Sequence, residues 1–156
     1  MALNNREVVS VLKDLIEVCK DGEQGYKDAA DDVKDNEVQK ILIKYSQQRG
    51  IFFAELDGIV RKLGGEIEFA GSILGILHRR WMDIKFGIAG SNTESILSEC
   101  IRGEKSALKS YEKVIDRELP EDILKIVRRQ YVEINEAYEH LIKLAESLGL
   151  RVDTGR

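Results

Sequence analysis

The chain has 156 residues, 33% of them charged, and a formal net charge of −4 at pH 7. This length suits one domain whose core can stabilise itself without disulfides or metals, and the negative charge gives no electrostatic reason to expect binding to nucleic acid or to an anionic membrane. Aromatic residues make up only 6% and Pro120 is the single proline, a composition that favours a helical bundle over a β-sandwich or barrel.

The spacing of apolar residues predicts two long helices in the first half of the chain. The first begins near Asn4 or Asn5, which are both good N-cap residues, and runs to about Val33. After a short polar turn, the second helix continues to Gly64-Gly65, where it ends. Because the turn is short, the two helices should form an antiparallel hairpin.

A second hairpin is predicted in the other half. Its first helix runs from about Glu94 to Arg117, and Pro120 fits position N1 of a helix that stops at Gly149. The connection between the hairpins is about 30 residues long and contains a short amphipathic segment around Trp81, so it can carry the chain back along the bundle. The predicted fold is an all-α four-helix bundle with a long crossover that contains a short fifth helix.

One five-residue pattern, C-x-x-G-E, occurs in both hairpins, from Cys19 to Glu23 and from Cys100 to Glu104. Helical periodicity places both glutamates near the centre of an apolar face. An isolated carboxylate there is costly, so each must be neutralised, paired or bound to a metal. The two cysteines have no disulfide or zinc-site spacing, and we expect them to be small buried apolar groups.

Two matches indicate that the hairpin is duplicated. The cysteine, glycine and glutamate of the two C-x-x-G-E copies share one offset, and Leu63-Gly64 at the end of the first hairpin corresponds to Leu148-Gly149 at the end of the second.

The duplicated hairpin, the long crossover and the two buried glutamates resemble the ferritin-like superfamily, and within it an uncharacterised bacterial family of ferritin-like four-helix-bundle proteins. The likeness covers nearly the whole chain. It is carried by four stretches: F-F-A-E-L at 52–56, L-G-G-E at 63–66, L-H-R-R-W-M-D at 77–83 and Gly103-Glu104. The resemblance implies a fold without an agreed activity, in a bacterial setting, with stress or maintenance physiology as the expected context.

Carboxylate-bridged di-metal bundles take one Glu from each of two helices and a Glu-x-x-His from each of the other two. Glu23 and Glu104 match the first pair, but neither of the chain's two histidines lies three residues after a glutamate. At the inward positions of the second and fourth helices the chain has Arg49 and Ile134, with Glu133 at the edge.

We therefore expect Arg49 to bridge Glu23 and Glu104 in place of the missing metals, because a guanidinium is a permanent cation whose fork matches carboxylates. The remaining lone pairs of the carboxylates would be satisfied by Gln130, Tyr26, Tyr45 or Tyr111. On this hypothesis the protein is a non-enzymatic scaffold or interaction protein without a cofactor and without catalytic residues.

Two alternatives stay open. In the first, Glu23 and Glu104 bend out to solvent. In the second, they bind iron or manganese with the help of Glu133, and the protein is a metal-binding protein or an oxidase or peroxide-handling enzyme. His140 is interpreted as a surface partner of Glu136, one helical turn earlier.

We expect residues 1–150 to form a single ferritin-like domain and residues 151–156 to be a C-terminal tail. No apolar run approaches the ~20 residues that a membrane span requires, and the first residues reach charge without an apolar signal core. The expected location is the cytoplasm, with neither nucleic acid nor membrane as a partner. The partner is left open between an unknown protein and a second copy of the chain in a homo-oligomer.

Overall fold

The structure, a computed structural model, describes residues 2–65, 92–152 and 154. Four long helices contain most of these residues: α1 (Asn5–Asp32), α2 (Asn36–Lys62), α4 (Thr93–Ile115) and α5 (Glu121–Ser147). No β-strand occurs within these ranges, so the described part of the chain is all-α, as the sequence predicts. The short helix expected around Trp81 lies outside the described residues.

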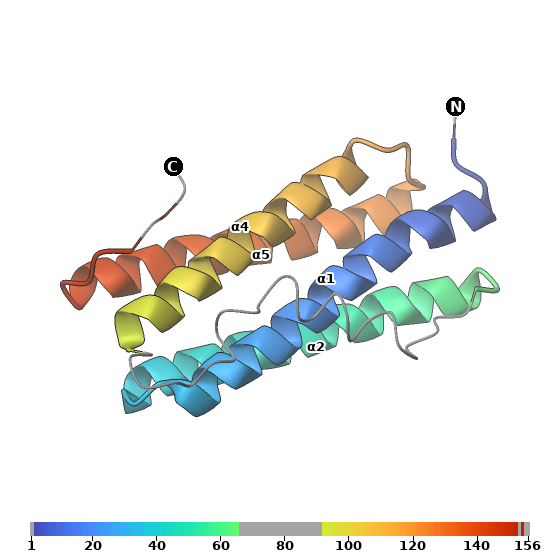
Figure 1. Ribbon diagram of the computed structural model, residues 1–156. Helices are drawn as coiled ribbons and strands as arrows, with labels where there is room; N and C mark the ends of the chain where they lie inside the picture. Colours follow the sequence, from blue (N-terminus) through green and yellow to red (C-terminus); the bar gives the residue numbers. More distant parts are fainter. Residues whose placement is uncertain (1, 66–91, 153, 155–156) are drawn as a thin grey trace.

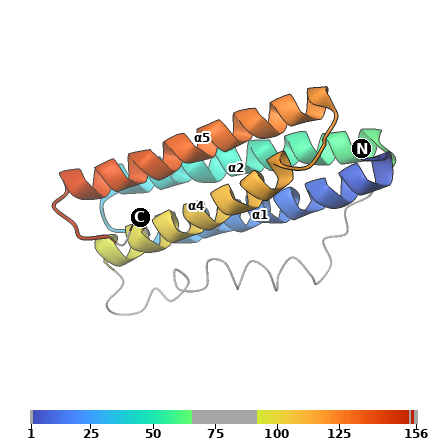
Figure 2. The same cartoon turned by 90° about the horizontal axis from the view of Figure 1, so that it is seen from above.

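The helices form a bundle of two antiparallel hairpins, α1 with α2 and α4 with α5 (Figure 1). Helix α1 also packs along α4, and α5 lies beside α2 (Figure 2), so that α2 and α4 face each other diagonally across the bundle. The end of α2 and the start of α4 lie at opposite ends of the bundle (Figure 1). The two helices therefore run in the same direction, as a one-crossover topology requires.

Polar side chains define where three of the helices begin. Asn4 and Glu7 form a capping box, in which the Asn4 side chain accepts from the Glu7 N–H at 2.9 Å and the Glu7 carboxylate accepts from the Asn4 N–H at 3.2 Å. Asp35 caps α2 and Asn92 caps α4 by accepting from N–H groups of the first turn. Pro120 is the N-cap of α5 rather than its N1 residue, because its ψ of 143° is extended while its carbonyl already accepts the first helical bonds.

The far ends of the two hairpins close in the same way. Gly64 and Gly149 adopt positive φ angles of 82° and 69°, which glycine adopts without the strain a side chain would add. The next N–H in each case donates to a carbonyl of the last helical turn at 2.9 Å: Gly65 to Val60 and Leu150 to Ala145. This shared geometry agrees with a duplicated hairpin.

One apolar core runs through the bundle and receives side chains from all four helices. Within the described residues, four polar side chains are also buried: Asp21, Arg49, Glu104 and Gln130. Two residues beyond α5 contact the bundle: the Tyr138 hydroxyl donates to the Thr154 carbonyl at 2.6 Å, and Val152 packs against the core. None of the described helices is long and apolar enough to cross a membrane.

Candidate functional site

A buried ion pair joins α2 to α4 across the diagonal of the bundle. The side chains of Arg49 and Glu104 are both 0% exposed. Nη1 of Arg49 donates to Oε1 of Glu104 at 2.5 Å, and Nη2 donates to Oε2. Both carboxylate oxygens therefore bind one guanidinium in the bidentate geometry that gives the strongest charged hydrogen bonds.

The charge of Arg49 is held in place by its partner. Burial on its own lowers the pKa of Arg49, but the charge of Glu104 and its hydrogen bonds outweigh burial, so the pKa lies above its ordinary value. The guanidinium carbon also lies 5.5 Å from the ring centroid of Tyr26, within the range of a cation–π contact. Burial, followed by the charge of Glu104, raises the pKa of Tyr26 well above its ordinary value, so this phenol stays protonated.

Gly22 makes room for the arginine side chain. A Cβ atom added at Gly22 would lie 3.1 Å from Cγ and 3.3 Å from Nη1 of Arg49. The glycine of the first C-x-x-G-E copy thus lets the stem of Arg49 lie close against the backbone of α1.

Glu23 lies apart from this pair. Its side chain is 35% exposed, and its carboxylate accepts a hydrogen bond from Lys20 at 3.0 Å. It lies against Gly50, where an added Cβ would come within 2.5 Å of Oε2. Among the described contacts, Arg49 pairs with Glu104 and not with Glu23, so the structure differs here from the expected two-carboxylate bridge.

The duplication gives a physical reason for this difference. Counted back from the matched Leu-Gly ends, Arg49 in the first hairpin corresponds to Ile134 in the second. Arg49 reaches diagonally from α2 to Glu104 on α4, whereas the buried Ile134 of α5 offers Glu23 on α1 no positive charge. Since an unpaired carboxylate is costly in an apolar core, Glu23 turns to the rim and pairs with Lys20.

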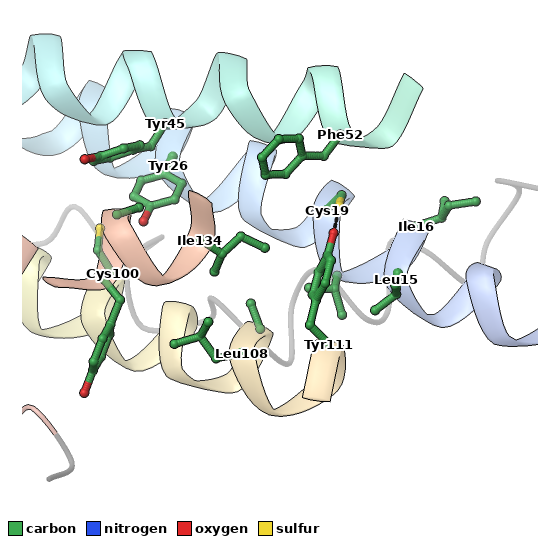
Figure 3. Packing of buried hydrophobic residues seen from close by; sticks show 14 of the residues in the cluster. Leu15, Ile16, Cys19, Tyr26, Tyr45, Phe52, Cys100, Leu108, Tyr111 and Ile134 are labelled. Carbon is green, nitrogen blue, oxygen red and sulfur yellow. Dashed lines mark hydrogen bonds between the residues drawn. The ribbon is translucent and has the colours of Figure 1, made fainter. Parts of the chain in front are cut away.

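A second polar network touches all four helices. Sγ of Cys19 lies 3.2 Å from the Tyr111 hydroxyl (Figure 3), which donates to Oε1 of Gln130 at 2.8 Å. Nε2 of Gln130 donates to Oε1 of Glu55 at 3.1 Å. Glu55 also pairs with Arg129, so the network runs from the buried thiol to the surface between α2 and α5.

The two cysteines are free and buried. Burial raises the pKa of Cys19 to about 11, although the Tyr111 hydrogen bond and the charge of Arg49 act in the opposite direction. Burial also raises the pKa of Cys100 well above its ordinary value. Burial therefore disfavours the thiolate, which is the nucleophilic form, at both cysteines.

A third polar contact joins α2 to α5. The Tyr45 hydroxyl and Nδ1 of the exposed His140 are hydrogen-bonded. The two rings meet edge to face, with centroids 5.8 Å apart and an interplanar angle of 76°. The sequence interpretation assigned Tyr45 to the carboxylate layer and His140 to Glu136, and did not bring these two residues together because their helices are distant along the chain.

Two buried or bridging carboxylates were missed from the sequence, Asp21 and Glu55. Asp21 is 0% exposed and lies in helical phase with the buried residues Val18 and Gly25, three residues before it and four after it. That phase is a signal from which its burial could have been predicted. Glu55 has no comparable signal, because its role depends on Gln130 and Arg129 of another helix.

The proposed metal ligands do not converge. Both oxygens of Glu104 bind Arg49, Glu23 binds Lys20, and the 37% exposed Glu133 accepts from Arg129 at 3.1 Å. In the part of the chain that the structure describes, no group of three or more His, Cys, Asp or Glu side chains is placed to hold a metal ion. These residues therefore do not fit the donor set of a di-metal centre.

Comparison with known proteins adds one relationship. No curated protein matches the chain. A family profile matches residues 7–117, a span that contains nearly all of α1 and the whole of α2 and α4, together with Glu23, Arg49 and Glu104. Because this span is more than half of the chain, the protein belongs to the family described as "Domain of unknown function (DUF2383)".

Proposed function

We propose that the protein is a non-enzymatic scaffold or interaction protein, built on a ferritin-like bundle in which an arginine–glutamate ion pair takes the place of a di-metal centre. The observation that carries the proposal is the bidentate contact of Arg49 with Glu104, with both side chains 0% exposed. A divalent cation beside this guanidinium would be repelled strongly, because charges interact with little screening in a protein interior.

The surroundings of the pair support a structural role. The guanidinium lies 5.5 Å from the ring centroid of Tyr26 and against Gly22, where an additional Cβ atom would not fit without movement. A substrate would have to displace packed side chains to reach Glu104. The pair therefore serves to specify how the helices meet, a role that buried polar groups fulfil in some other helical assemblies.

On this proposal the biological role belongs to the outer surface of the bundle. Among the described residues, four large apolar side chains are exposed: Ile43 and Ile51 on α2, Val132 on α5 and Leu148 directly after α5, at 43%, 61%, 53% and 42%. Exposed apolar groups are common singly, but a binding partner would find most of its apolar contact on these two helices. The partner is another protein or a second copy of the chain, and the setting is the bacterial cytoplasm, with stress or maintenance physiology as its context.

Metal analysis tests the absence of a catalytic centre. The iron and manganese content is measured for protein purified without chelator, as wild type, as Glu104→Gln and as the surface control Glu37→Gln. Glu37 is 81% exposed and pairs only with its neighbour Lys40 among the described contacts. The proposal expects no stoichiometric metal in any sample. A stoichiometric metal that is lost in Glu104→Gln and retained in Glu37→Gln would overturn it.

Complementation tests the interaction role. In a strain whose deletion of this gene causes a measurable defect, Ile51→Arg alters the surface, whereas the double change of Arg49→Met with Glu104→Met removes the ion pair and keeps similar volumes. The proposal expects the surface variant to reproduce the defect and the core double variant to restore the wild-type behaviour. The opposite pattern would place the function at the buried pair.

A further inference from the structure

A series of ring contacts leads from the buried ion pair to the surface of α5. The guanidinium carbon of Arg49 lies 5.5 Å from the Tyr26 centroid, and the centroids of Tyr26 and Tyr45 are 5.6 Å apart. Figure 3 shows these two rings next to each other below α2. Tyr45 in turn contacts His140, with 5.8 Å between centroids. Since Tyr45 is 5% exposed and His140 is exposed, the series ends at solvent.

The hydroxyl of Tyr45 is hydrogen-bonded to Nδ1 of His140. In the tautomer that carries the ring proton on Nε2, this nitrogen accepts from the phenol and can take up its proton. Because His140 is exposed, its other ring nitrogen can exchange protons with water. A proton that leaves Tyr45 therefore has both an acceptor and a route to solvent.

Other tyrosines have poorer acceptors. The hydroxyls of Tyr111 and Tyr138 donate to an amide oxygen of Gln130 and to a backbone carbonyl, neither of which is a base at ordinary pH. Tyr131 contacts the carboxylate of Glu112 at 3.4 Å, a longer contact with a group that is less basic than imidazole. Of these four, Tyr45 alone combines burial with an imidazole acceptor.

The charges around Tyr45 keep its phenol protonated. Burial is the largest cause, followed by the charge of Glu104 on α4, with Arg49 opposing and Glu136 of α5 adding to the effect, and together they raise the pKa of Tyr45 to about 12. On its own helix, the Lys44 ammonium lies 6.0 Å from the ring centroid. A phenolate is therefore not populated near pH 7, and Tyr45 can lose an electron readily only if its proton leaves at the same time.

We propose that Tyr45 and His140 form a redox-active pair that gives one electron to an external one-electron oxidant of the peroxyl-radical class. In this step the O–H bond of Tyr45 breaks, its proton forms a bond to Nδ1 of His140, and its electron passes to the oxidant. The products are a neutral tyrosyl radical, an imidazolium ion and a hydroperoxide anion. An electron from a small-molecule thiolate and the proton held on His140 restore the pair and leave a thiyl radical.

Exposure distinguishes Tyr45 from Tyr26 as the electron donor. Tyr26 is 0% exposed. Tyr45 contacts the exposed His140 at the rim of the bundle and can therefore pass its proton toward solvent. This inference does not depend on the proposed scaffold role, because it needs neither a metal nor a protein partner.

Flash photolysis of the full chain with a ruthenium(III) polypyridyl oxidant tests the proposal. The rate and yield of tyrosyl radical are followed by absorbance, and electron paramagnetic resonance distinguishes that radical from an indolyl radical on Trp81, the chain's one tryptophan. We expect Tyr45→Phe to remove most of the tyrosyl signal. His140→Gln keeps a hydrogen-bond acceptor but not a base, and it should slow radical formation by about 100-fold, the lower end of what a positioned base contributes.

Tyr131→Phe is the matched control, because it removes a hydrogen-bonded tyrosine outside the pair and should leave the signal unchanged. His140 is exposed, so its substitution should not prevent folding even if that of Tyr45 does. An unchanged rate in His140→Gln would overturn the proposal. A full tyrosyl yield in folded Tyr45→Phe would also overturn it, since the electron would then come from another tyrosine.

Discussion

Arg49 carries a permanent charge out of contact with water, and Glu104 is the acidic partner that the structure gives it. Removing the arginine alone, as in Arg49→Met, leaves a buried carboxylate without its counter-ion and should lower the free energy of unfolding by about 3–5 kcal/mol. Replacing both partners by methionine removes the stranded charge and should recover most of that loss. Urea denaturation measures all three proteins. A double variant no more stable than Arg49→Met would contradict this account.

The glycines of the helices allow a second test. Gly58 is exposed in α2 and has nothing within 4 Å of an added Cβ, so Gly58→Ala should stabilise the protein by about 0.5–1 kcal/mol through helix propensity. Gly22→Ala has the same propensity gain, but its Cβ would lie 3.1 Å from Cγ of the fixed Arg49 side chain. We expect a net loss of about 1 kcal/mol from overpacking.

Thermal or urea unfolding of the two alanine variants shows whether overpacking outweighs the gain in helix propensity at Gly22. Gly50→Ala is informative as a third variant, because its Cβ would meet the carboxylate end of the partly exposed Glu23, which can rotate away. Its effect should lie between the other two. If Gly22→Ala were as stabilising as Gly58→Ala, the close contact with Arg49 would carry no energetic weight.

At the scale of single residues, the sequence predicts which side chains point into the bundle better than it predicts which of them pair with each other. Helical phase directs Arg49 and Glu104 toward the inside of the bundle, where the structure brings the two side chains into contact. Phase gives only the direction in which a side chain leaves the helix, so Glu23 on a similar face could still turn toward Lys20. Whether each glutamate is buried and paired depends on the residue diagonally across the bundle, which is Arg49 for Glu104 and Ile134 for Glu23. Only the three-dimensional arrangement shows which residues these are.

The two hairpins end in equivalent glycine caps, and this equivalence can be measured. Gly64 and Gly149 have φ angles of 82° and 69° with open space around an added Cβ, so alanine there meets backbone strain without a packing clash. Gly64→Ala and Gly149→Ala should each lower the free energy of unfolding by about 1 kcal/mol, and the two losses should be similar. Differential scanning calorimetry of both variants checks this. A negligible effect in either would mean that its cap differs in solution.

The bounds of the helices follow closely from their capping residues. The predicted ends lie within a few residues of the observed ones because Asn4, Gly64 and Gly149 have strong conformational preferences. Pro120 was placed one position too far into α5, since its fixed φ suits both the N-cap and N1, and only its ψ separates the two. The predicted crossover helix falls outside the described residues.

At the scale of the whole molecule, stability should fall in alkaline solution. Burial, as the largest cause, raises the pKa of Cys19 from 9.0 to about 11 and that of Tyr45 from 10.0 to about 12. Between these values the unfolded chain releases protons that the folded protein keeps, so a rise in pH favours unfolding. The stabilisation that comes from these two raised pKa values is complete below about pH 9 and is lost progressively up to about pH 12.

Urea denaturation across this range measures the effect. In Tyr45→Phe the free energy of unfolding should fall less steeply with pH than in the wild type, because the variant lacks one of the groups whose pKa is raised. A free energy of unfolding that stays constant from pH 9 to about 11 would contradict the assignment of these buried groups.

The all-α bundle was predicted correctly because each long helix has its own apolar stripe, which is a local property of the sequence. Which helices face each other diagonally is not local. The links Tyr45–His140, Glu55–Arg129 and Cys19–Tyr111 each join residues far apart in the chain, and no repeat or spacing in one sequence encodes them.

The diagonal direction of the Arg49–Glu104 contact has a mechanical consequence. Because α2 and α4 are parallel, a shift of one helix past the other by a single residue, ~1.5 Å, would stretch both hydrogen bonds at once. The pair thus opposes axial sliding of one hairpin relative to the other. Ile134 provides no equivalent for α5 and α1, so any sliding that does occur should be greater along that other diagonal.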